Sequence, residues 1–267
     1  MNHVPPDVSR RTALRLTAAS AAGVPLALLL AGPANAQAVA ARPIEDVGLT
    51  LPGGQSVRAK LARPAAARAP AMMLIHENRG LSRDIEQMAS LFAQEGFLAL
   101  AIDLFDGQTA ADQAEAQRLQ LTGKINPAVA TETVKAWIAW LRAHQNGTGK
   151  VGTVGWCFGG AWSLNASLAA PVDATVIYYG RVPADPAVLA PLASPVLGHF
   201  GLEDRGINQE MVGAWQRAMA AASKRAEVHW YPANHAFANP TGNRYHEESA
   251  RLAWGRTLAF LRANLGG

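Results

Sequence analysis

Short apolar runs alternate with helical patterns along most of this chain, and the alternation limits the possible folds more than any single motif. The runs at 71–77 and 97–103 are continuous, which is typical of parallel strands buried on both faces. In the intervening segments, apolar residues recur every three to four positions, as on one face of a helix. We expect strands near 71–77, 97–103, 150–156, 174–180, 194–201 and 226–232, and helices near 82–96, 109–122, 127–145, 158–169, 207–222 and 244–265.

This order of elements predicts an α/β fold: right-handed crossovers give a mostly parallel central sheet flanked by helices on both faces. A β-hairpin precedes it, in which VGLTL and SVRAKLAR flank the turn Pro52-Gly53-Gly54. The chain has 267 residues, 49% of them hydrophobic, and no internal repeat or interdomain linker separates its elements. We therefore expect one domain over residues 37–267.

The first 36 residues have the features of an export signal. Arg10-Arg11 precedes a mild apolar run at 21–31, and the small-residue site Ala34-Asn35-Ala36 follows it. The arginine pair indicates the twin-arginine route, a mature chain starting near Gln37, and a periplasmic or secreted protein. An uncleaved anchor is the alternative, although the apolar run is short for a membrane span.

The charge distribution excludes some partners. The net charge is +4, and residues 1–36 hold three arginines against one aspartate, so +2 remains for the rest of the chain. That remainder has no run of lysines or arginines and no basic helix face, so we expect no nucleic-acid partner. We also expect no stable membrane insertion once the signal is removed. The sequence does not predict the oligomeric state.

Cys157 is the only cysteine, and it lies in the turn of VGTVGWCFGGAW between an expected strand and an expected helix. A protein bound for an oxidising compartment usually pairs its cysteines or has none. Cys157 is therefore either a small buried apolar residue or a reactive thiol. A helix N-terminus directly after it would stabilise a thiolate or an oxyanion.

Two further residues make the reactive alternative more specific. Ligands in parallel sheets bind at the carboxyl ends of strands. Asp204 follows the strand near 194–201, and His235 follows the strand near 226–232. The chain order Cys157, Asp204, His235 is the nucleophile–acid–histidine order of hydrolases with a strand–turn–helix nucleophile. Glu203 is a competitor for the acid, and Asp103 is expected to order a loop.

The motifs HENRG, AIDLFDG, GWCFGG, YYG, GLED and YPANHAF occur here in this order, from about Val47 to Leu265. In these motifs the chain resembles the dienelactone hydrolase (carboxymethylenebutenolidase) family. The resemblance implies an α/β-hydrolase fold, a Cys157–His235–Asp204 triad and an auxiliary glutamate at Glu77 that contacts the thiol before substrate arrives. Such a contact would keep the thiol protonated and less prone to oxidation. A buried pairing of Glu77 with an arginine is the alternative.

The amide N–H of Phe158 is the expected oxyanion donor, and the family pattern adds the amide N–H of Asn78. His76 is expected to pack rather than to react. The candidate substrate-pocket residues are Arg79, Phe105, Trp156, Tyr178, Arg181 and Phe237.

The sequence departs from the family at two arginines that bind the substrate carboxylate. They would follow the DLF segment and the catalytic histidine, where this chain has Asp106-Gly107 and Ala238-Asn239. Neither Asp106 nor Asn239 can replace a bidentate guanidinium, although Arg79 or Arg181 could act from other strand ends. We expect the triad to persist with a substrate other than the family's anionic lactone.

These observations predict a cysteine hydrolase of lactones or small carboxylic esters that needs no metal or cofactor. The chain shows no clustered His/Asp ligand set, no phosphate-binding loop and no dinucleotide-binding motif. One alternative is a thioesterase or acyl-transfer enzyme with the same triad. Another is a non-catalytic ligand-binding or thiol-sensing protein, which would not need Asp204 and His235 together.

Overall fold

The computed structural model describes residues 42–119 and 121–266, so the expected export signal lies outside the described residues and stays a prediction. Eight strands form one sheet in the order β1-β2-β4-β3-β5-β6-β7-β8. Strands β3 to β8 run parallel, whereas β2 pairs antiparallel with β1 and β4. The strands are β1 (Ile44–Thr50), β2 (Ser56–Ala62), β3 (Ala69–Ile75), β4 (Leu98–Ile102), β5 (Gly147–Trp156), β6 (Ala174–Tyr178), β7 (Val196–Gly201) and β8 (Ala226–Tyr231).

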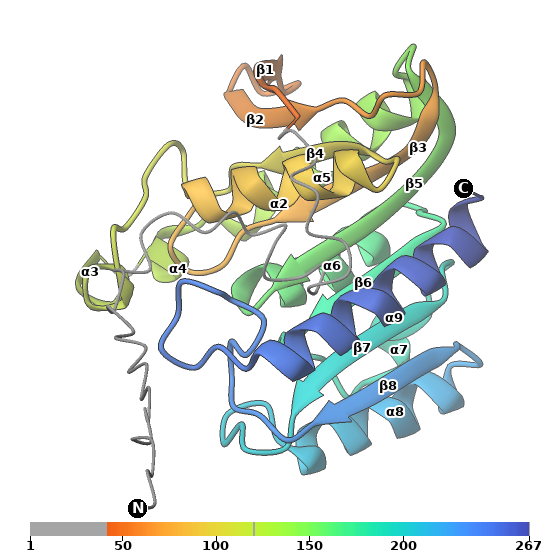
Figure 1. The fold of residues 1–267 in the computed structure, drawn as a ribbon. Helices are drawn as coiled ribbons and strands as arrows, with labels where there is room; N and C mark the ends of the chain where they lie inside the picture. Colours follow the sequence, from red (N-terminus) through yellow and green to blue (C-terminus); the bar gives the residue numbers. More distant parts are fainter. Residues whose placement is uncertain (1–41, 120, 267) are drawn as a thin grey trace, which may run out of the picture.

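Helices cover both faces of this sheet (Figure 1). Helices α2 and α9 pack in one buried apolar cluster, and α5 and α6 pack in a second cluster on the other face. Helix α8 packs beyond α6 in a third cluster. The helices are α2 (Arg83–Gln94), α3 (Gln113–Leu119), α4 (Leu121–Lys124), α5 (Pro127–Ala143), α6 (Phe158–Ala169), α7 (Pro186–Leu189), α8 (Gln209–Ala221) and α9 (Glu247–Leu265).

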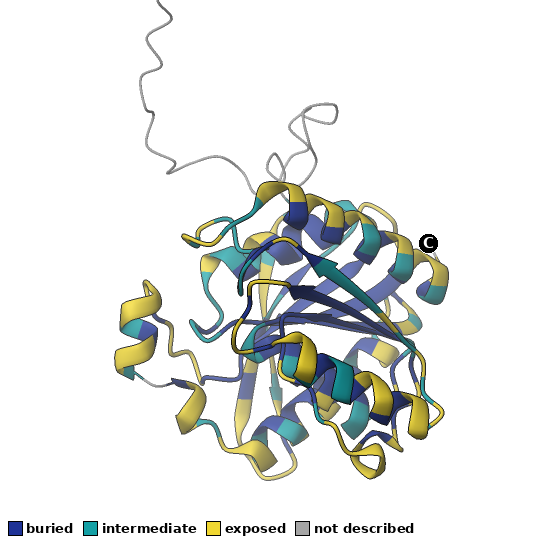
Figure 2. Cartoon of the chain, turned by 90° about the horizontal axis from the view of Figure 1, so that it is seen from below, coloured by how far each residue is buried: buried dark blue, intermediate teal, exposed yellow. Residues whose placement is uncertain are grey.

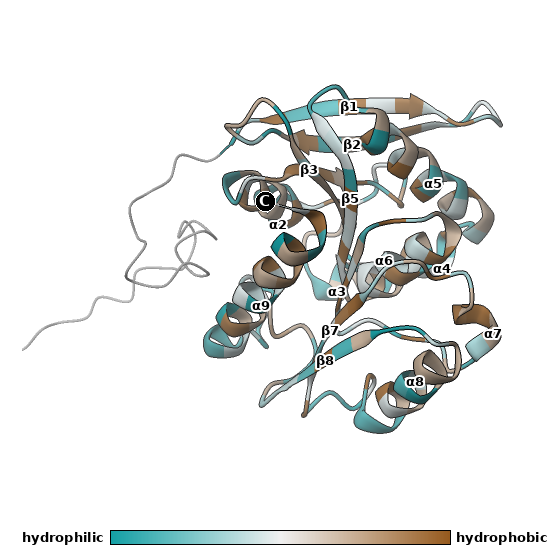
Figure 3. Ribbon diagram, turned by 90° about the vertical axis from the view of Figure 1, so that its right-hand side faces the viewer, coloured by the Kyte–Doolittle hydropathy of each residue, from teal (hydrophilic) through white to brown (hydrophobic). Residues whose placement is uncertain are grey.

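Strand β3 shows why the parallel strands are apolar throughout. Met72 and Leu74 belong to the cluster beneath α2 and α9, whereas Met73 and Ile75 belong to the cluster beneath α5 and α6. All seven residues of β3 are buried, because side chains alternate between two covered faces. Figure 2 shows the sheet buried between helices whose outer sides are exposed, and Figure 3 shows apolar residues where the helices meet the sheet. The α/β fold predicted from the sequence is confirmed.

The expected hairpin is present, and most helices begin and end within a few residues of their predicted bounds. In β1 and β2, Thr50 pairs with Ser56 across the turn. The helix expected at 109–122 is present at 113–119 and 121–124 (α3 and α4), so it begins four residues later than expected. Ser82 is at the N-cap of α2 but makes no side-chain capping bond.

None of the helices within residues 42–119 and 121–266 is both long enough and apolar enough to cross a membrane.

Because β3 to β8 are parallel, their carboxyl ends meet at one edge of the sheet. His76, Asp103, Cys157 and Tyr179 directly follow β3, β4, β5 and β6 at that edge. The loops after β7 and β8 bring Asp204 and His235 there as well. The fold therefore gathers the sequence-predicted polar residues in one region.

Candidate active site

Cys157 forms a sharp turn between β5 and α6. Its φ of 55° and ψ of −116° are unusual for a non-glycine residue and cost energy that the surrounding packing must offset. Its amide donates to the carbonyl of Tyr178 at 3.0 Å, which ties the turn to the end of β6. Half-buried at the N-terminus of α6, the thiol has the geometry of a nucleophile elbow.

The glycines around Cys157 allow α6 to approach the strand ends closely. A Cβ placed on Gly159 would lie 2.1 Å from the carbonyl oxygen of Ile75 and 2.4 Å from that of His76. A Cβ on Gly155 would lie 1.9 Å from the carbonyl oxygen of Gly159. Any side chain at either position would push α6 away from the sheet and move Cys157.

We expect Gly159→Ala to lower the free energy of unfolding by about 2–3 kcal/mol, the upper range for overpacking. Gly255→Ala in α9 is the matched control, because a Cβ there meets nothing within 4 Å. That change should stabilise the protein by about 0.5–1 kcal/mol through backbone entropy. Urea unfolding of both variants checks that Gly159→Ala lowers the free energy of unfolding and that Gly255→Ala raises it. A Gly159→Ala variant as stable as the wild type would contradict the packing described here.

Cys157, His235 and Asp204 form one chain of hydrogen bonds. The Nε2 atom of His235 lies 3.1 Å from Cys157 Sγ, and its Nδ1 lies 2.6 Å from Asp204 Oδ2. A carboxylate at Nδ1 fixes a proton there, so Nε2 is the nitrogen that can exchange a proton with the thiol. The three residues lie 47 and 31 positions apart in the chain, and the loops after three parallel strands bring them together.

The loop after β7 holds Asp204 in place and leaves Glu203 out of the site. Asp204 Oδ1 accepts the amides of Gly206 and Ile207, at 2.8 and 2.9 Å. Burial acts to raise the pKa of Asp204, but these amides and His235 outweigh it and hold the pKa below its ordinary value. Glu203 is exposed. The structure therefore selects Asp204 as the partner of His235.

The electrostatics favour a proton on His235. Burial acts to lower the pKa of the imidazole, but its bonds to Asp204 and Cys157 raise that pKa to about 10. The imidazole can therefore accept the proton of the thiol that lies 3.1 Å from its Nε2 atom.

Glu77 lies in the site, but it does not make the contact with the thiol that the resemblance implied. Its Oε1 accepts the hydroxyl of Tyr179 at 3.2 Å, and its Oε2 accepts the side-chain amide of Asn239 at 2.6 Å. No hydrogen bond joins Glu77 to Cys157, both of which the structure describes. Burial raises the pKa of Glu77 despite these two donors. The resting contact is absent because polar partners from two other elements hold the carboxylate.

The amides of Phe158 and Asn78 are both free to bind an anion. Neither donates a hydrogen bond to another residue within the described part of the chain. Phe158 opens α6, so its N–H also benefits from the positive end of the helix dipole. His76 supports the Asn78 turn: its Nδ1 donates to the carbonyl of Glu77 at 2.7 Å, and its Nε2 accepts the amide of Leu104 at 3.1 Å.

A small cavity beside the cysteine, lined by its neighbour Trp156 but not by Cys157 itself, contains some of the predicted pocket residues. Arg79 and Trp156 line it together with Glu77, Tyr179 and Asn239. The guanidinium of Arg79 is already bonded to the carbonyl of Ala111 at 2.6 Å and lies 3.4 Å from the carboxylate of Asp84. Arg79 is therefore a pocket residue with most of its hydrogen-bonding capacity used.

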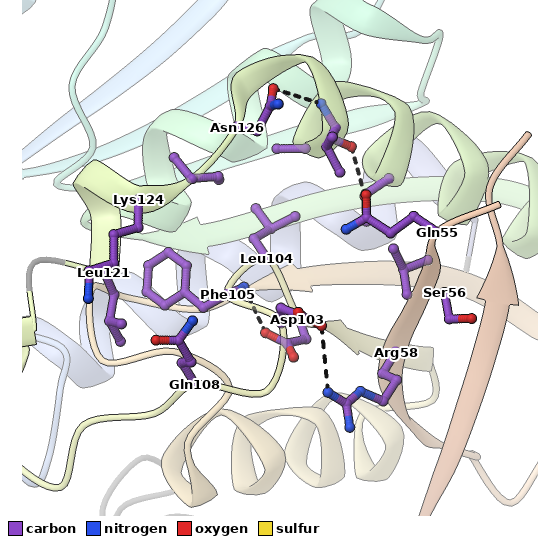
Figure 4. Close-up of a pocket in the computed structure, with 16 residues that line it drawn as sticks. Gln55, Ser56, Arg58, Asp103, Leu104, Phe105, Gln108, Leu121, Lys124 and Asn126 are labelled. Atoms are coloured by element: carbon purple, nitrogen blue, oxygen red, sulfur yellow. Dashed lines mark hydrogen bonds and ion pairs between the residues drawn. The ribbon is translucent and has the colours of Figure 1, made fainter. Parts of the chain in front are cut away.

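The other predicted pocket residues lie elsewhere. Figure 4 shows Phe105 in a second cavity of about 400 Å³, which it lines with Arg58 of β2 and Asn126 before α5. The Phe105 ring packs against His76 and Phe158, with centroids 4.5 and 5.1 Å apart, and so forms a wall near the cysteine.

Tyr178 and Phe237 are buried in the core and line neither of these two cavities. Tyr178 shares a hydrogen bond with Thr257 of α9, and Phe237 packs behind Tyr179. Arg181 is exposed and does not line the cavity beside the cysteine. As predicted, Asp103 orders its loop, by accepting the amides of Phe105 and Gly107.

Sequence reasoning missed the roles of Tyr179 and Asn239. Both contact Glu77, and the Tyr179 ring also packs edge-on against His235 with centroids 5.1 Å apart. The tyrosine pair at the end of β6 and the asparagine four residues after His235 can both be seen in the sequence. Neither position indicates a contact with Glu77, which lies 102 and 162 residues away.

Comparison with known proteins identifies the family of this chain. The sequence pattern of the dienelactone hydrolase family matches residues 57–265. A Yersinia pestis protein named "Putative carboxymethylenebutenolidase" is 30% identical, covering 79% of this chain and 86% of its own. Carboxymethylenebutenolidase of Pseudomonas putida is 29% identical, over 81% and 95%.

A crystal structure titled "Putative Dienelactone Hydrolase", from Klebsiella pneumoniae, superposes with a TM-score of 0.72 at 29% identity, covering 82% of this chain and 98% of that one. The family model covers most of the chain, and the nucleophile elbow and the carboxyl-edge cluster lie inside the matched region. The chain therefore belongs to the dienelactone hydrolase family and has its α/β-hydrolase fold.

Proposed function

We propose that this protein hydrolyses lactones or small carboxylic esters through a covalent thioester on Cys157. The observation that supports this best is the hydrogen-bonded chain from Cys157 Sγ through His235 to Asp204, set on a nucleophile elbow. The names of the curated relatives support a lactone or ester as the substrate. A sulfur nucleophile, a general base and an orienting acid are the parts that acyl transfer needs.

In the first half of the reaction, His235 Nε2 holds the proton of Cys157, and the thiolate attacks the carbonyl carbon of the ester. The carbonyl π electrons move to oxygen, and the amide N–H groups of Phe158 and Asn78 stabilise that oxyanion. As the oxyanion collapses, the bond to the leaving oxygen breaks. His235 transfers its proton to that oxygen, which leaves a thioester on Cys157.

In the second half, His235 removes a proton from water, and the hydroxide attacks the thioester carbonyl. Collapse of the second oxyanion breaks the carbon–sulfur bond, releases the carboxylic acid and returns the thiolate. Asp204 keeps its bond to Nδ1 throughout, which fixes the tautomer of His235 and stabilises the imidazolium. Protein groups alone therefore suffice for the full cycle.

The purified protein tests this proposal with p-nitrophenyl acetate, a neutral lactone and a thioester of the same acyl group. We expect turnover of the oxygen esters that rises with pH until the thiolate is fully formed. A much faster reaction with the thioester would favour the thioesterase alternative. Binding without turnover of any member of the panel would favour the non-catalytic alternative and reject the proposed function.

We expect the enzyme to prefer neutral esters over carboxylated ones by about tenfold or more in kcat/KM. The cavity beside the cysteine presents the carboxylates of Glu77 and Asp84 and only one guanidinium, that of Arg79. Because Arg79 is already bonded to Asp84 and to backbone carbonyls, a substrate carboxylate would meet mostly negative charge. Kinetics with a matched pair, a diester and its half-ester acid, measure the ratio, and a preference for the acid would contradict this account.

A further inference from the structure

Asn239 is held rigidly by the loop that follows His235. Its Oδ1 accepts the amide N–H of Thr241 at 3.0 Å, and its backbone carbonyl accepts the amide of Gly242 at 3.0 Å. Because a backbone N–H can only donate, the oxygen of the Asn239 side chain must face Thr241. The Nδ2 group is therefore directed at Glu77, and the orientation of the amide is fixed by its partners.

The bond from Asn239 determines where the Glu77 carboxylate points. Asn239 Nδ2 donates to Oε2 at 2.6 Å, and Tyr179 donates to Oε1 at 3.2 Å, so each oxygen of Glu77 has a partner other than Cys157. Glu77 is 8% exposed, so water offers it little competition for these donors. Without them, a buried carboxylate would seek another donor, and the thiol of Cys157 is a hydrogen-bond donor in the same site.

Because of the charged and titratable groups around the site, the position of the Glu77 carboxylate affects the stability of a thiolate on Cys157. The thiol faces His235 at 3.1 Å, and Tyr179 interacts electrostatically with both the Cys157 sulfur and Glu77. His235 and Arg79 are the cations whose fields reach Glu77. A carboxylate rotated toward the sulfur would repel a thiolate and favour the neutral thiol.

We propose that Asn239 is a positioning residue that holds the Glu77 carboxylate away from Cys157, so that the thiol stays paired with His235 before substrate binds. His235 Nε2 can then take the proton of Cys157 directly, and no rearrangement of Glu77 is needed to form the thiolate. This inference rests on the proposed function, because it concerns the readiness of the same nucleophile. The proposal also assigns a positioning role to Asn239, which occupies a position where the family pattern has an arginine.

The pH dependence of Cys157 alkylation by iodoacetamide tests the proposal without using the hydrolase activity. In Asn239→Ala the freed carboxylate should disfavour the thiolate by electrostatic repulsion, so alkylation at neutral pH should slow by about tenfold. Asn239→Asp keeps an acceptor for Thr241 but places a carboxylate against Glu77, so it should give a shift of the same sign. Asn243→Ala is the control. Asn243 is an exposed residue of the same loop, so Cys157 in this variant should be alkylated as in the wild type.

A double-mutant cycle separates this role from a merely structural one. If Asn239 acts through the Glu77 charge, Asn239→Ala should change the alkylation profile less than twofold in a Glu77→Gln background. Wild-type profiles in both Asn239 variants, or a shift that persists in the Glu77→Gln background, would overturn the proposal. Alkylation that shifts as expected in a protein without ester turnover would instead reject the proposed function and leave the role of Asn239 standing.

Discussion

Cys157→Ala should reduce ester turnover to the uncatalysed background, a loss of about 10⁴-fold or more in kcat. The reason is that alanine removes the atom that forms the covalent intermediate, while the oxyanion donors and the pocket stay in place. The backbone at position 157 has a positive φ, and alanine tolerates it about as poorly as cysteine does, so the change should cost little stability. Initial rates with p-nitrophenyl acetate measure the effect.

Two measurements keep this result interpretable. Urea unfolding of Cys157→Ala should give nearly the wild-type midpoint, which would exclude misfolding as the cause of the loss. Cys157→Ser should retain weak activity at most, because His235 must then activate an alcohol whose pKa is far above that of a thiol. Wild-type turnover by the alanine variant would show that Cys157 is not the nucleophile.

His235→Ala is the second large effect, with an expected loss of about 10³–10⁴-fold in kcat/KM. The histidine stabilises the thiolate at rest, protonates the leaving oxygen and activates water, so its removal affects both halves of the reaction. It also leaves Asp204 without the partner that lies 2.6 Å away. Burst and steady-state kinetics with p-nitrophenyl acetate, measured across pH, show which half-reaction is slowed more.

The thiol itself provides an independent readout of the same variant. In His235→Ala the thiol loses the base that lies 3.1 Å from it, so iodoacetamide alkylation at neutral pH should slow markedly. His229→Ala is the control, because this histidine lies on β8 and bonds to Glu227 rather than to the site. Equal losses in the two histidine variants would indicate a general structural effect and contradict the role assigned to His235.

The sheet could be predicted from the sequence because strands that are buried on both faces are continuous apolar runs. Strand β3 is apolar at every position, and α6 (Phe158–Ala169) begins at the residue predicted after the cysteine turn. The start of the helix expected at 109–122 was predicted less well: residues 109–112 are not helical, and the described helical residues that follow bury only Ala116 and Leu121. So little apolar burial leaves a weak pattern from which to locate the end of a helix.

The hydrogen-bonded cluster of Cys157, Asp204 and His235 was predictable for a related reason, since each member follows a strand that is itself easy to locate. Parallel strands deliver their carboxyl-end loops to one edge, so the order along the chain was enough to bring Cys157, Asp204 and His235 together. The position of Glu77 was not predictable in this way. It depends on the side-chain amide of Asn239, whose orientation is fixed by Thr241, and on the hydroxyl of Tyr179.

Which of the predicted residues line the pocket could not be predicted from the sequence either. Tyr178 and Tyr179 are neighbours, yet the hydroxyl of Tyr178 meets Thr257 in the core and that of Tyr179 meets Glu77 in the site. Both rings belong to the same apolar cluster, with centroids 6.1 Å apart, so they do not alternate between the two faces of the sheet as successive strand residues do. The turn after β6, where Tyr179 has a φ of 40°, determines which of the two enters the site. A sequence pattern of two adjacent tyrosines contains no record of that turn.

The central claim is that a thioester on Cys157 lies on the reaction path, and trapping that species is the direct test. Wild-type protein is mixed with p-nitrophenyl acetate, quenched in acid within the first turnovers, and analysed by intact-mass and peptide mass spectrometry. We predict a mass increase of one acetyl group on the peptide that contains Cys157, formed with the first burst of p-nitrophenol and lost as the substrate is consumed. Steady turnover with no acetyl on Cys157, or an acetyl that forms on another residue at the rate of turnover, would contradict the account.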